Sequence, residues 1–287
     1  ASEQSRLVAR NNTCEENKQA GIALFGSAQG EVEGNTCRNN GIHGIAANEQ
    51  SRLVARNNTC EENKQAGIAL FGSAQGEVEG NTCRNNGIHG IAANEQSRLV
   101  ARNNTCGGNK SSGIALVGGA QGELKDNICY KNGYHGIVGN ELSRLVARTN
   151  ACDGNQQDGI GLFGSSQGEL EGNTCRKNSC HGIAGNDHSH LVARNNTCDE
   201  NKRAGIALFG SAQGELQGNT CRRNEQRGIY AGDHSRLVAR NNTCEENKQA
   251  GIALFGSAQG EVVRNTCRRN TGRGIYVAQG AQVSEGD

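Results

Sequence analysis

Apolar and polar residues alternate in short runs along the whole chain, and turn-forming Asn and Gly residues separate the runs. Ile22 and Leu24 flank one residue, as do Leu7 and Ala9. A helical repeat would instead place apolar residues three and four positions apart. Alternation in steps of two, bounded by turn residues, is typical of short β-strands. The pattern therefore predicts an all-β chain of short strands joined by tight turns.

This pattern returns every 23 residues. Steps of 23 from Cys14 meet a cysteine each time as far as Cys267, and steps from Asn12 and Asn17 meet asparagine in the same way. Short strands that repeat at a fixed length predict a solenoid whose coils stack in parallel about 4.8 Å apart, wound to the right. We therefore predict one domain, residues 1–287, that forms a right-handed parallel β-helix solenoid of about twelve coils.

A second period of 46 residues is superimposed on the first, because residues 3–48 and 49–94 are identical. Large and small residues alternate between successive coils, and so do acidic and basic residues, as at Glu15 and Arg38. Opposite charges on adjacent coils attract each other. Each exposed pair contributes only about 0.2–1 kcal/mol, but the alternation helps to fix the register.

The cysteine column predicts a buried ladder of thiols. In-register side chains point the same way rather than at each other, which disfavours disulfides. No two cysteines have the C-x-x-C spacing of a zinc site. We interpret the ladder as a reduced, inert apolar column, which favours a reducing, cytoplasmic location. The asparagine columns are expected at turns, where stacked amides bond from coil to coil.

Composition excludes several classes of function. The 287 residues include 30 basic and 29 acidic side chains, for a net charge of +1, and only 3% aromatic residues. Neither a basic surface nor an aromatic platform is present for nucleic acid. No apolar run approaches the roughly 18 residues of a membrane span. We expect no nucleic-acid partner, no membrane contact and no cofactor. Because the chain opens within a repeat, we expect a processed product, an excised domain or a designed protein.

The stretches Gly21–Leu24 and Val32–Asn40 carry a resemblance to a known family. They resemble the right-handed parallel β-helix repeat of the pectate-lyase-like superfamily, and most closely its carbohydrate-binding and sugar-hydrolase modules. The resemblance covers practically the whole chain and implies the solenoid fold. That superfamily includes lyases, hydrolases, epimerases, adhesins and non-catalytic modules, so the resemblance leaves the activity open. Cysteine in place of the commoner aliphatic residue is a departure of this chain.

Candidate chemistry lies where the repeat breaks. The position before each repeated glycine holds His135, Asp158 and His181 in three consecutive coils, with Cys180 beside them. Two imidazoles around a carboxylate could hold a divalent metal or form an acid–base pair. The alternative is a solvated column in which Asp158 neutralises its neighbours.

Two further groups of residues are candidate sites. His188 and His190 are expected to face the same way on a strand, which makes them weaker candidates for a metal. Asp153, Asp199 and Glu245 form an acidic column two coils apart. Arginines lie between these acids in the column and are expected to keep them ionised and paired, so this column is not expected to be catalytic.

Three functions are compatible with the sequence. The first is a non-catalytic, rigid structural or binding module that presents a lateral face to a polysaccharide or a protein. The alternative is a polysaccharide lyase or hydrolase that works around His135, Asp158 and His181. The third is a rigid spacer. A column of phenylalanines could contribute to a binding face or pack under a turn: Phe25, Phe71, Phe163, Phe209 and Phe255. The terminal coils lack an evident cap, so end-to-end self-association is also expected.

Overall fold

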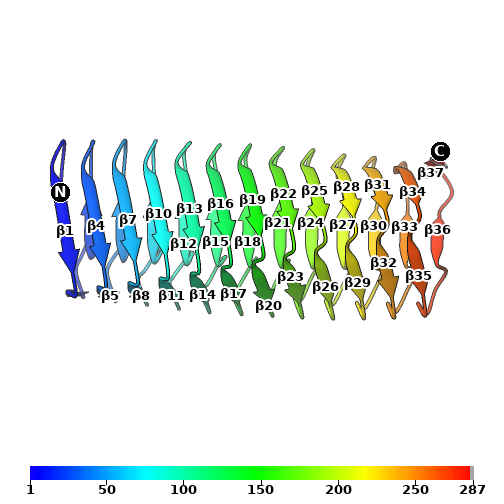
Figure 1. Ribbon diagram of the computed structural model, residues 1–287, viewed down its shortest axis with the longest axis horizontal. Coiled ribbons are helices and arrows are strands. Elements are labelled where there is room, and N and C mark those ends of the chain that lie inside the picture. The colour runs from blue at the N-terminus through cyan, green and yellow to red at the C-terminus, as the bar shows by residue number, and fades with distance from the viewer. Residues whose placement is uncertain (285–287) are drawn as a thin grey trace. The chain divides into compact units, whose positions relative to one another are not determined.

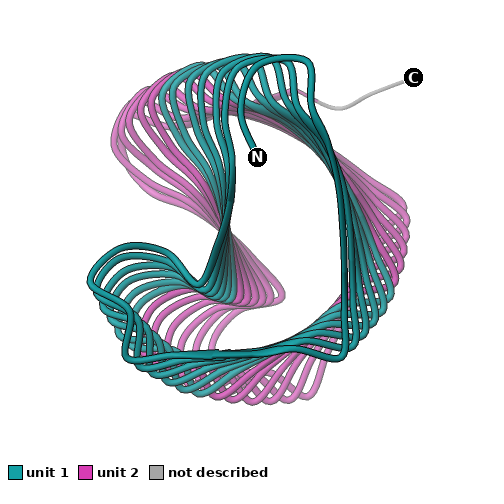
Figure 2. Cartoon of the chain, turned by 90° about the vertical axis from the view of Figure 1, so that its left-hand side faces the viewer, with its two compact units in different colours: residues 1–146 teal, residues 147–287 magenta. Residues whose placement is uncertain are grey.

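The computed structural model describes residues 1–284, and these residues form β-strands joined by turns, without a helix. The chain divides into two compact units, residues 1–146 and 147–287, coloured teal and magenta in Figure 2. Each coil adds one strand to each of three parallel sheets, named A, B and C here (Figure 1). Within residues 1–284 no helix is long and apolar enough to cross a membrane.

The first unit contains six strands of each sheet, given in the order in which they pair. Sheet A contains β1 (Arg6–Arg10), β4 (Gln29–Glu33), β7 (Arg52–Arg56), β10 (Gln75–Glu79), β13 (Arg98–Arg102) and β16 (Gln121–Lys125). Sheet B contains β2 (Thr13–Glu15), β5 (Thr36–Arg38), β8 (Thr59–Glu61), β11 (Thr82–Arg84), β14 (Thr105–Gly107) and β17 (Ile128–Tyr130). Sheet C contains β3 (Ile22–Leu24), β6 (Ile45–Ala47), β9 (Ile68–Leu70), β12 (Ile91–Ala93), β15 (Ile114–Leu116) and β18 (Ile137–Gly139).

The second unit is built in the same way, and β19 (Arg144–Arg148) includes residues of both units. Its sheet A contains β22 (Gln167–Glu171), β25 (His190–Arg194), β28 (Gln213–Gln217), β31 (Arg236–Arg240), β34 (Gln259–Val263) and β37 (Gln282–Ser284). Sheet B contains β20 (Ala151–Asp153), β23 (Thr174–Arg176), β26 (Thr197–Asp199), β29 (Thr220–Arg222), β32 (Thr243–Glu245) and β35 (Thr266–Arg268). Sheet C contains β21 (Ile160–Leu162), β24 (Ile183–Gly185), β27 (Ile206–Leu208), β30 (Ile229–Ala231), β33 (Ile252–Leu254) and β36 (Ile275–Val277).

The register confirms the 23-residue repeat. Cys14 pairs with Cys37 in the first unit, and Cys175 pairs with Cys198 in the second. Within each unit, residues 23 positions apart therefore lie over one another in successive coils. The predicted right-handed parallel β-helix solenoid is confirmed. The prediction that residues 1–287 form a single domain stays a prediction.

The cysteine ladder fills the interior together with Ile and Leu columns. Cys37, Ile45 and Leu53 are completely buried, and none of the thirteen cysteines is in a disulfide. The hydrogen bond to the Cys60 thiol and burial both raise the pKa of Cys37. The Cys37 thiol is therefore protonated at neutral pH and packs as a small apolar side chain.

The asparagine columns form the predicted ladders of amides. The Nδ2 of Asn63 donates to the Oδ1 of Asn86 at 3.0 Å and to the carbonyl of Cys37 at 3.0 Å. Its Oδ1 accepts the backbone N–H of Asn40 at 3.1 Å. Each buried asparagine thus satisfies turn backbone in neighbouring coils, which a side chain without an amide cannot do.

Close approach of the backbone explains the repeated glycine before each strand of sheet C. A Cβ atom on Gly44 would lie 2.6 Å from the carbonyl oxygen of Gly67 and 3.0 Å from the Nδ2 of Asn63. Both atoms belong to the next coil, whose position is held by the hydrogen bonds of the asparagine ladder. Any larger side chain would separate the coils at this point.

Candidate functional site

The column before the repeated glycine contributes residues to both units. His43, His89 and His135 belong to the first unit, and Asp158 and His181 belong to the second. His135 is 5% exposed, Asp158 is 4% exposed and His181 is 5% exposed. All three sequence-predicted residues are therefore buried rather than solvated. The stacking of His135 with the other two stays a prediction.

Within the second unit, Asp158, Cys180 and His181 come together. One potential ligand atom from each residue lies within 4.8 Å of the others. The Oδ1 of Asp158 accepts the backbone N–H of His181 at 2.9 Å. Cys180 is half-buried and lies outside the thiol ladder. Two separate departures from the repeat, at 158 and at 180, therefore meet at one place.

The protonation states at this cluster limit its chemistry. The Nδ1 of His181 accepts the backbone N–H of Ala204 at 3.1 Å, which places the proton of the neutral ring on Nε2. Burial lowers the pKa of His181 to about 4. Burial and the nearby Asp158 carboxylate raise the pKa of the Cys180 thiol to about 12. At neutral pH the cluster therefore holds a neutral imidazole and a protonated thiol.

A metal ion at this cluster would have to compete with these bonds. Ligation through Nδ1 would break the bond from Ala204, and ligation through Nε2 would displace its proton. The charge of Arg203 also acts on both Cys180 and His181. The geometry therefore does not favour a cation, and metal or acid–base roles for these residues stay predictions.

The second pair of histidines is arranged differently from the expectation. His188 lies in the turn before β25, with a φ of 63°, and only His190 is part of the strand. The two side chains therefore do not share one strand face. Among the described residues 1–284, no group of three potential ligands includes either histidine.

The acidic column is paired with arginine, as expected. The Asp153 carboxylate lies 3.1 Å from the Arg176 guanidinium, and the Glu245 carboxylate lies 2.7 Å from that of Arg268. Asp199, of which only 12% of the side chain is exposed, lies 2.6 Å from Arg223. These carboxylates serve as partners for guanidinium groups along sheet B.

A row of aromatic rings along the outer face of sheet C was not found from the sequence. It continues from His181 through successive ring-to-ring centroid distances of 5.3, 5.0, 5.7 and 5.2 Å. We call this set the aromatic row: Phe209, Tyr230, Phe255 and Tyr276. The signal that could have revealed it is tyrosine in place of alanine in the middle of β30 and β36.

Two arginines lie over the aromatic row. The guanidinium carbon of Arg227 is 4.6 Å from the centre of the Phe255 ring and 5.0 Å from that of Tyr230. Arg273 lies 5.6 Å from the centre of Tyr276. Each such contact contributes about 0.5–1 kcal/mol at an exposed site. The rings therefore hold two positive charges at one end of the described chain.

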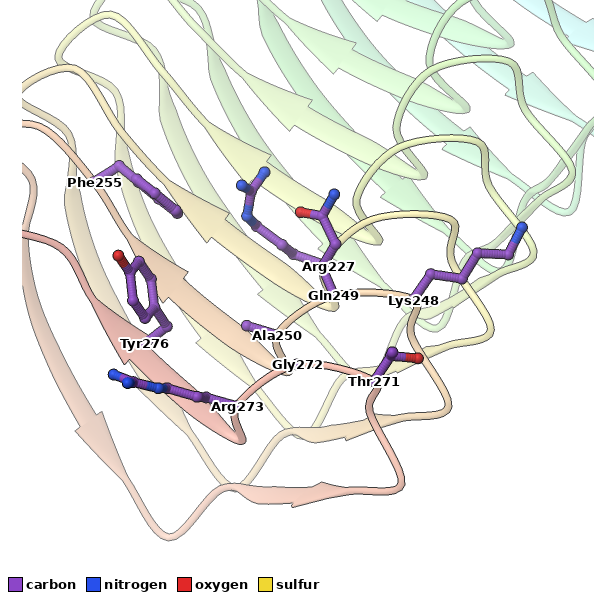
Figure 3. Close-up of a pocket in the computed structure, with 9 residues that line it drawn as sticks. All are labelled: Arg227, Lys248, Gln249, Ala250, Phe255, Thr271, Gly272, Arg273 and Tyr276. Carbon is purple, nitrogen blue, oxygen red and sulfur yellow. The ribbon is translucent and has the colours of Figure 1, made fainter.

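A pocket of about 420 Å³ adjoins these residues. Figure 3 shows Phe255 and Tyr276 on one side and Lys248 and Thr271 on the other. The complete lining comprises Arg227, Lys248, Gln249, Ala250, Phe255, Thr271, Gly272, Arg273 and Tyr276. The cavity is therefore lined by two aromatic rings, by the small residues Ala250 and Gly272, and by three cationic side chains.

Comparison with known proteins identifies the fold. A family model described as the right-handed beta helix region matches residues 1–105, 74–214 and 194–285, which is nearly the entire chain. A search of curated proteins finds no significant match.

Solved structures give the same result. A double mutant of the periplasmic alginate epimerase AlgG is 14% identical, covers 99% of this chain and 70% of its own, and has a TM-score of 0.59. AlgG itself is 13% identical over 97% of this chain and 77% of its own, with a TM-score of 0.52. The A-module of the Azotobacter vinelandii mannuronan C-5 epimerase AlgE4 is 13% identical over 98% of this chain and 76% of its own, with a TM-score of 0.45. At these identities the likeness to the two AlgG structures shows the fold alone.

Proposed function

We propose that this chain, which belongs to the right-handed β-helix family, is a non-catalytic module that binds a polysaccharide at the aromatic row of its second unit. The observation that carries the proposal is the pocket between Phe255 and Tyr276 on one side and Lys248 on the other. Pockets lined by aromatic surface and a few polar groups are the usual form of a binding site.

The chemistry of a sugar ring suits this surface. The C–H groups of a sugar present an apolar face to aromatic side chains, while its hydroxyl groups accept hydrogen bonds from cationic side chains. The aromatic row continues over consecutive coils, so it offers contacts to more than one ring of an extended chain. The name of the similarly folded alginate epimerase supports a polysaccharide as the class of ligand.

The lyase or hydrolase alternative centres on Asp158 and His181. A histidine whose pKa is about 4 is a weak base at neutral pH, which makes the alternative less favourable. Its test is the Asp158→Asn variant, which should lose any turnover of a polysaccharide that the parent protein shows. Turnover that is lost with this variant would favour the enzymatic function over the binding module.

Binding measurements on a panel of neutral and acidic polysaccharides test the proposal. Affinity electrophoresis and calorimetry should detect binding, and Tyr276→Ala should weaken it by about tenfold, as expected for a central aromatic contact. Phe71→Ala is the matched control, because Phe71 packs against Ala66, Ala69 and Ala92 in the first unit. That variant should change the affinity less than about twofold, a typical value for residues outside the contact.

Two outcomes would contradict the proposal. One is that no polysaccharide of the panel binds the parent protein. The other is an equal loss of affinity in Tyr276→Ala and Phe71→Ala, which would place the site outside the aromatic row.

A further inference from the structure

The column before the repeated glycine has a regular hydrogen-bonding geometry. In several coils, its backbone N–H points to the side chain of the residue one coil earlier. The Ala66 N–H reaches the Nδ1 of His43 at 3.2 Å, and the His181 N–H reaches the Oδ1 of Asp158 at 2.9 Å. Ala204 and His181 repeat the arrangement at 3.1 Å. In these coils the acceptor is therefore the His or Asp side chain that the earlier coil carries at this position.

A coil whose predecessor carries alanine or arginine in this column lacks that acceptor, as at His43, His89 and Arg227. The two column residues beside the aromatic row are also of this kind. The coils that precede Ala250 and Arg273 carry Arg227 and Ala250 at the column position. Neither an arginine nor an alanine side chain can accept a hydrogen bond. Within residues 1–284, no protein group accepts the N–H of Ala250 or of Arg273. Both residues line the pocket, so two residues whose backbone N–H has no protein acceptor in the described chain contribute to its lining.

Positive charge accompanies these donors. The guanidinium groups of Arg227 and Arg273 are held over aromatic rings of the aromatic row. Among the described residues, no carboxylate forms an ion pair with either group, whereas Arg268 is paired with Glu245 at 2.7 Å. Lys248 is less available, since its Nζ lies 3.7 Å from an oxygen of Glu225. The charge of Arg227 and Arg273 is therefore not neutralised by the described part of the chain.

We infer that this pocket binds an oxyanion, a carboxylate or a sulfate, through the backbone N–H groups of Ala250 and Arg273 and the guanidinium groups of Arg227 and Arg273. Backbone amides and guanidinium groups together match the geometry and charge of such a group. The inference deepens the proposed function, because an acidic sugar of a polysaccharide would supply the oxyanion. A free inorganic anion would use the same donors.

The first experiment uses inorganic sulfate as the probe. Titration of the isotopically labelled protein, followed by amide NMR shifts, should show saturable shifts at Ala250 and Arg273. The Ala250→Asp variant should abolish them, because its carboxylate would occupy the Arg273 N–H and oppose an anion. Asp158 shows that a coil accommodates aspartate at this position.

The matched control is Ala20→Asp, which makes the same substitution in the same column of the first unit. It should leave the sulfate-induced shifts at Ala250 and Arg273 unchanged. Thermal unfolding of each variant checks that it is folded. The inference is overturned if sulfate produces no saturable shift at these two amides, or if folded Ala250→Asp binds sulfate as the parent does.

The second experiment separates this inference from the proposed function. It compares a uronic-acid tetrasaccharide with the same tetrasaccharide after reduction of its carboxyl groups. The acidic form should bind about tenfold more tightly, the usual effect of one charge-assisted hydrogen bond. Equal affinities would overturn the oxyanion site as a saccharide subsite and leave the proposed function standing. Binding of sulfate alone, with neither saccharide bound, would contradict the proposed function while the oxyanion site remained.

Discussion

The imidazole of His181 accepts a hydrogen bond from the backbone N–H of Ala204, with 3.1 Å between Nδ1 and the amide nitrogen. His43 and Ala66 form the same contact in the first unit at 3.2 Å. An imidazole can accept at Nδ1 only while that nitrogen is unprotonated. Both histidines therefore connect adjacent coils only in their neutral form.

This contact predicts that acid weakens the fold. Burial lowers the pKa of His43, His89 and His181 from 6.5 to about 4. The unfolded chain binds these protons more readily, so the stability that neutral histidine contributes is complete above about pH 6.5 and is lost as the pH falls towards 4. We expect a loss of about 1–3 kcal/mol for each histidine. Urea unfolding at pH values from 7 to 4.5 measures it.

The control for this prediction is a triple variant with alanine at the three histidines, which is the residue that Ala20 and Ala204 already place in the column. Its stability should change much less over the same pH range. Parallel pH profiles for the variant and the parent would show that the histidines are not responsible.

The close approach of Gly44 to Gly67 predicts that a methyl group at residue 44 destabilises the fold. A Cβ at Gly44 would lie 2.6 Å from the Gly67 carbonyl oxygen, so Gly44→Ala should reduce the free energy of unfolding by about 2 kcal/mol or more. Gly274 occupies the same column, but its nearest neighbour would be the Cβ of Cys267 at 3.4 Å. Gly274→Ala should therefore cost less than about 1 kcal/mol. Chemical denaturation of the two variants compares them directly, and similar losses would contradict the steric explanation.

The asparagine ladder predicts a large cost for removing one buried amide. Asn63→Ala removes the side-chain bonds to the Cys37 carbonyl and the Asn40 N–H, and it leaves Asn86 Oδ1 with only the bond from the backbone N–H of residue 63. We expect a loss of about 2–5 kcal/mol in the free energy of unfolding, because buried polar groups are left without hydrogen bonds. The exposed neighbour Lys64 provides the control, and Lys64→Ala should change the stability by less than about 0.5 kcal/mol. A small effect at Asn63 would mean that the ladder contributes little to stability.

The sequence predicted the columns of the fold because its period is fixed. When coils stack in register, residues 23 positions apart become neighbours, as Cys14 and Cys37 are. The ladders of thiols and amides, the alternating ion pairs and the glycine column all follow from that relation. The pairing of Glu245 with Arg268, for example, requires no information beyond the period.

The candidate site was predicted only in part. The sequence identified Asp158 and His181 as departures from the repeat, but it did not show that their side chains are buried and engaged with backbone N–H groups. The direction of a side-chain bond depends on the local turn, which the period does not specify. The position of His188 outside β25 has the same cause, since its turn has a positive φ.

The sequence by itself determined which residues lie over one another, because a constant coil length converts distance along the chain into position along the solenoid. Only the tertiary structure decided which side chains from different columns contact each other on the outer surface. Tyr230 and Phe255 occupy different positions of the repeat, so counting in steps of 23 never aligns them. Their rings lie 5.7 Å apart because long side chains extend sideways and along the sheet to neighbouring coils. The aromatic row, the arginines over it and the pocket beside it depend on that reach.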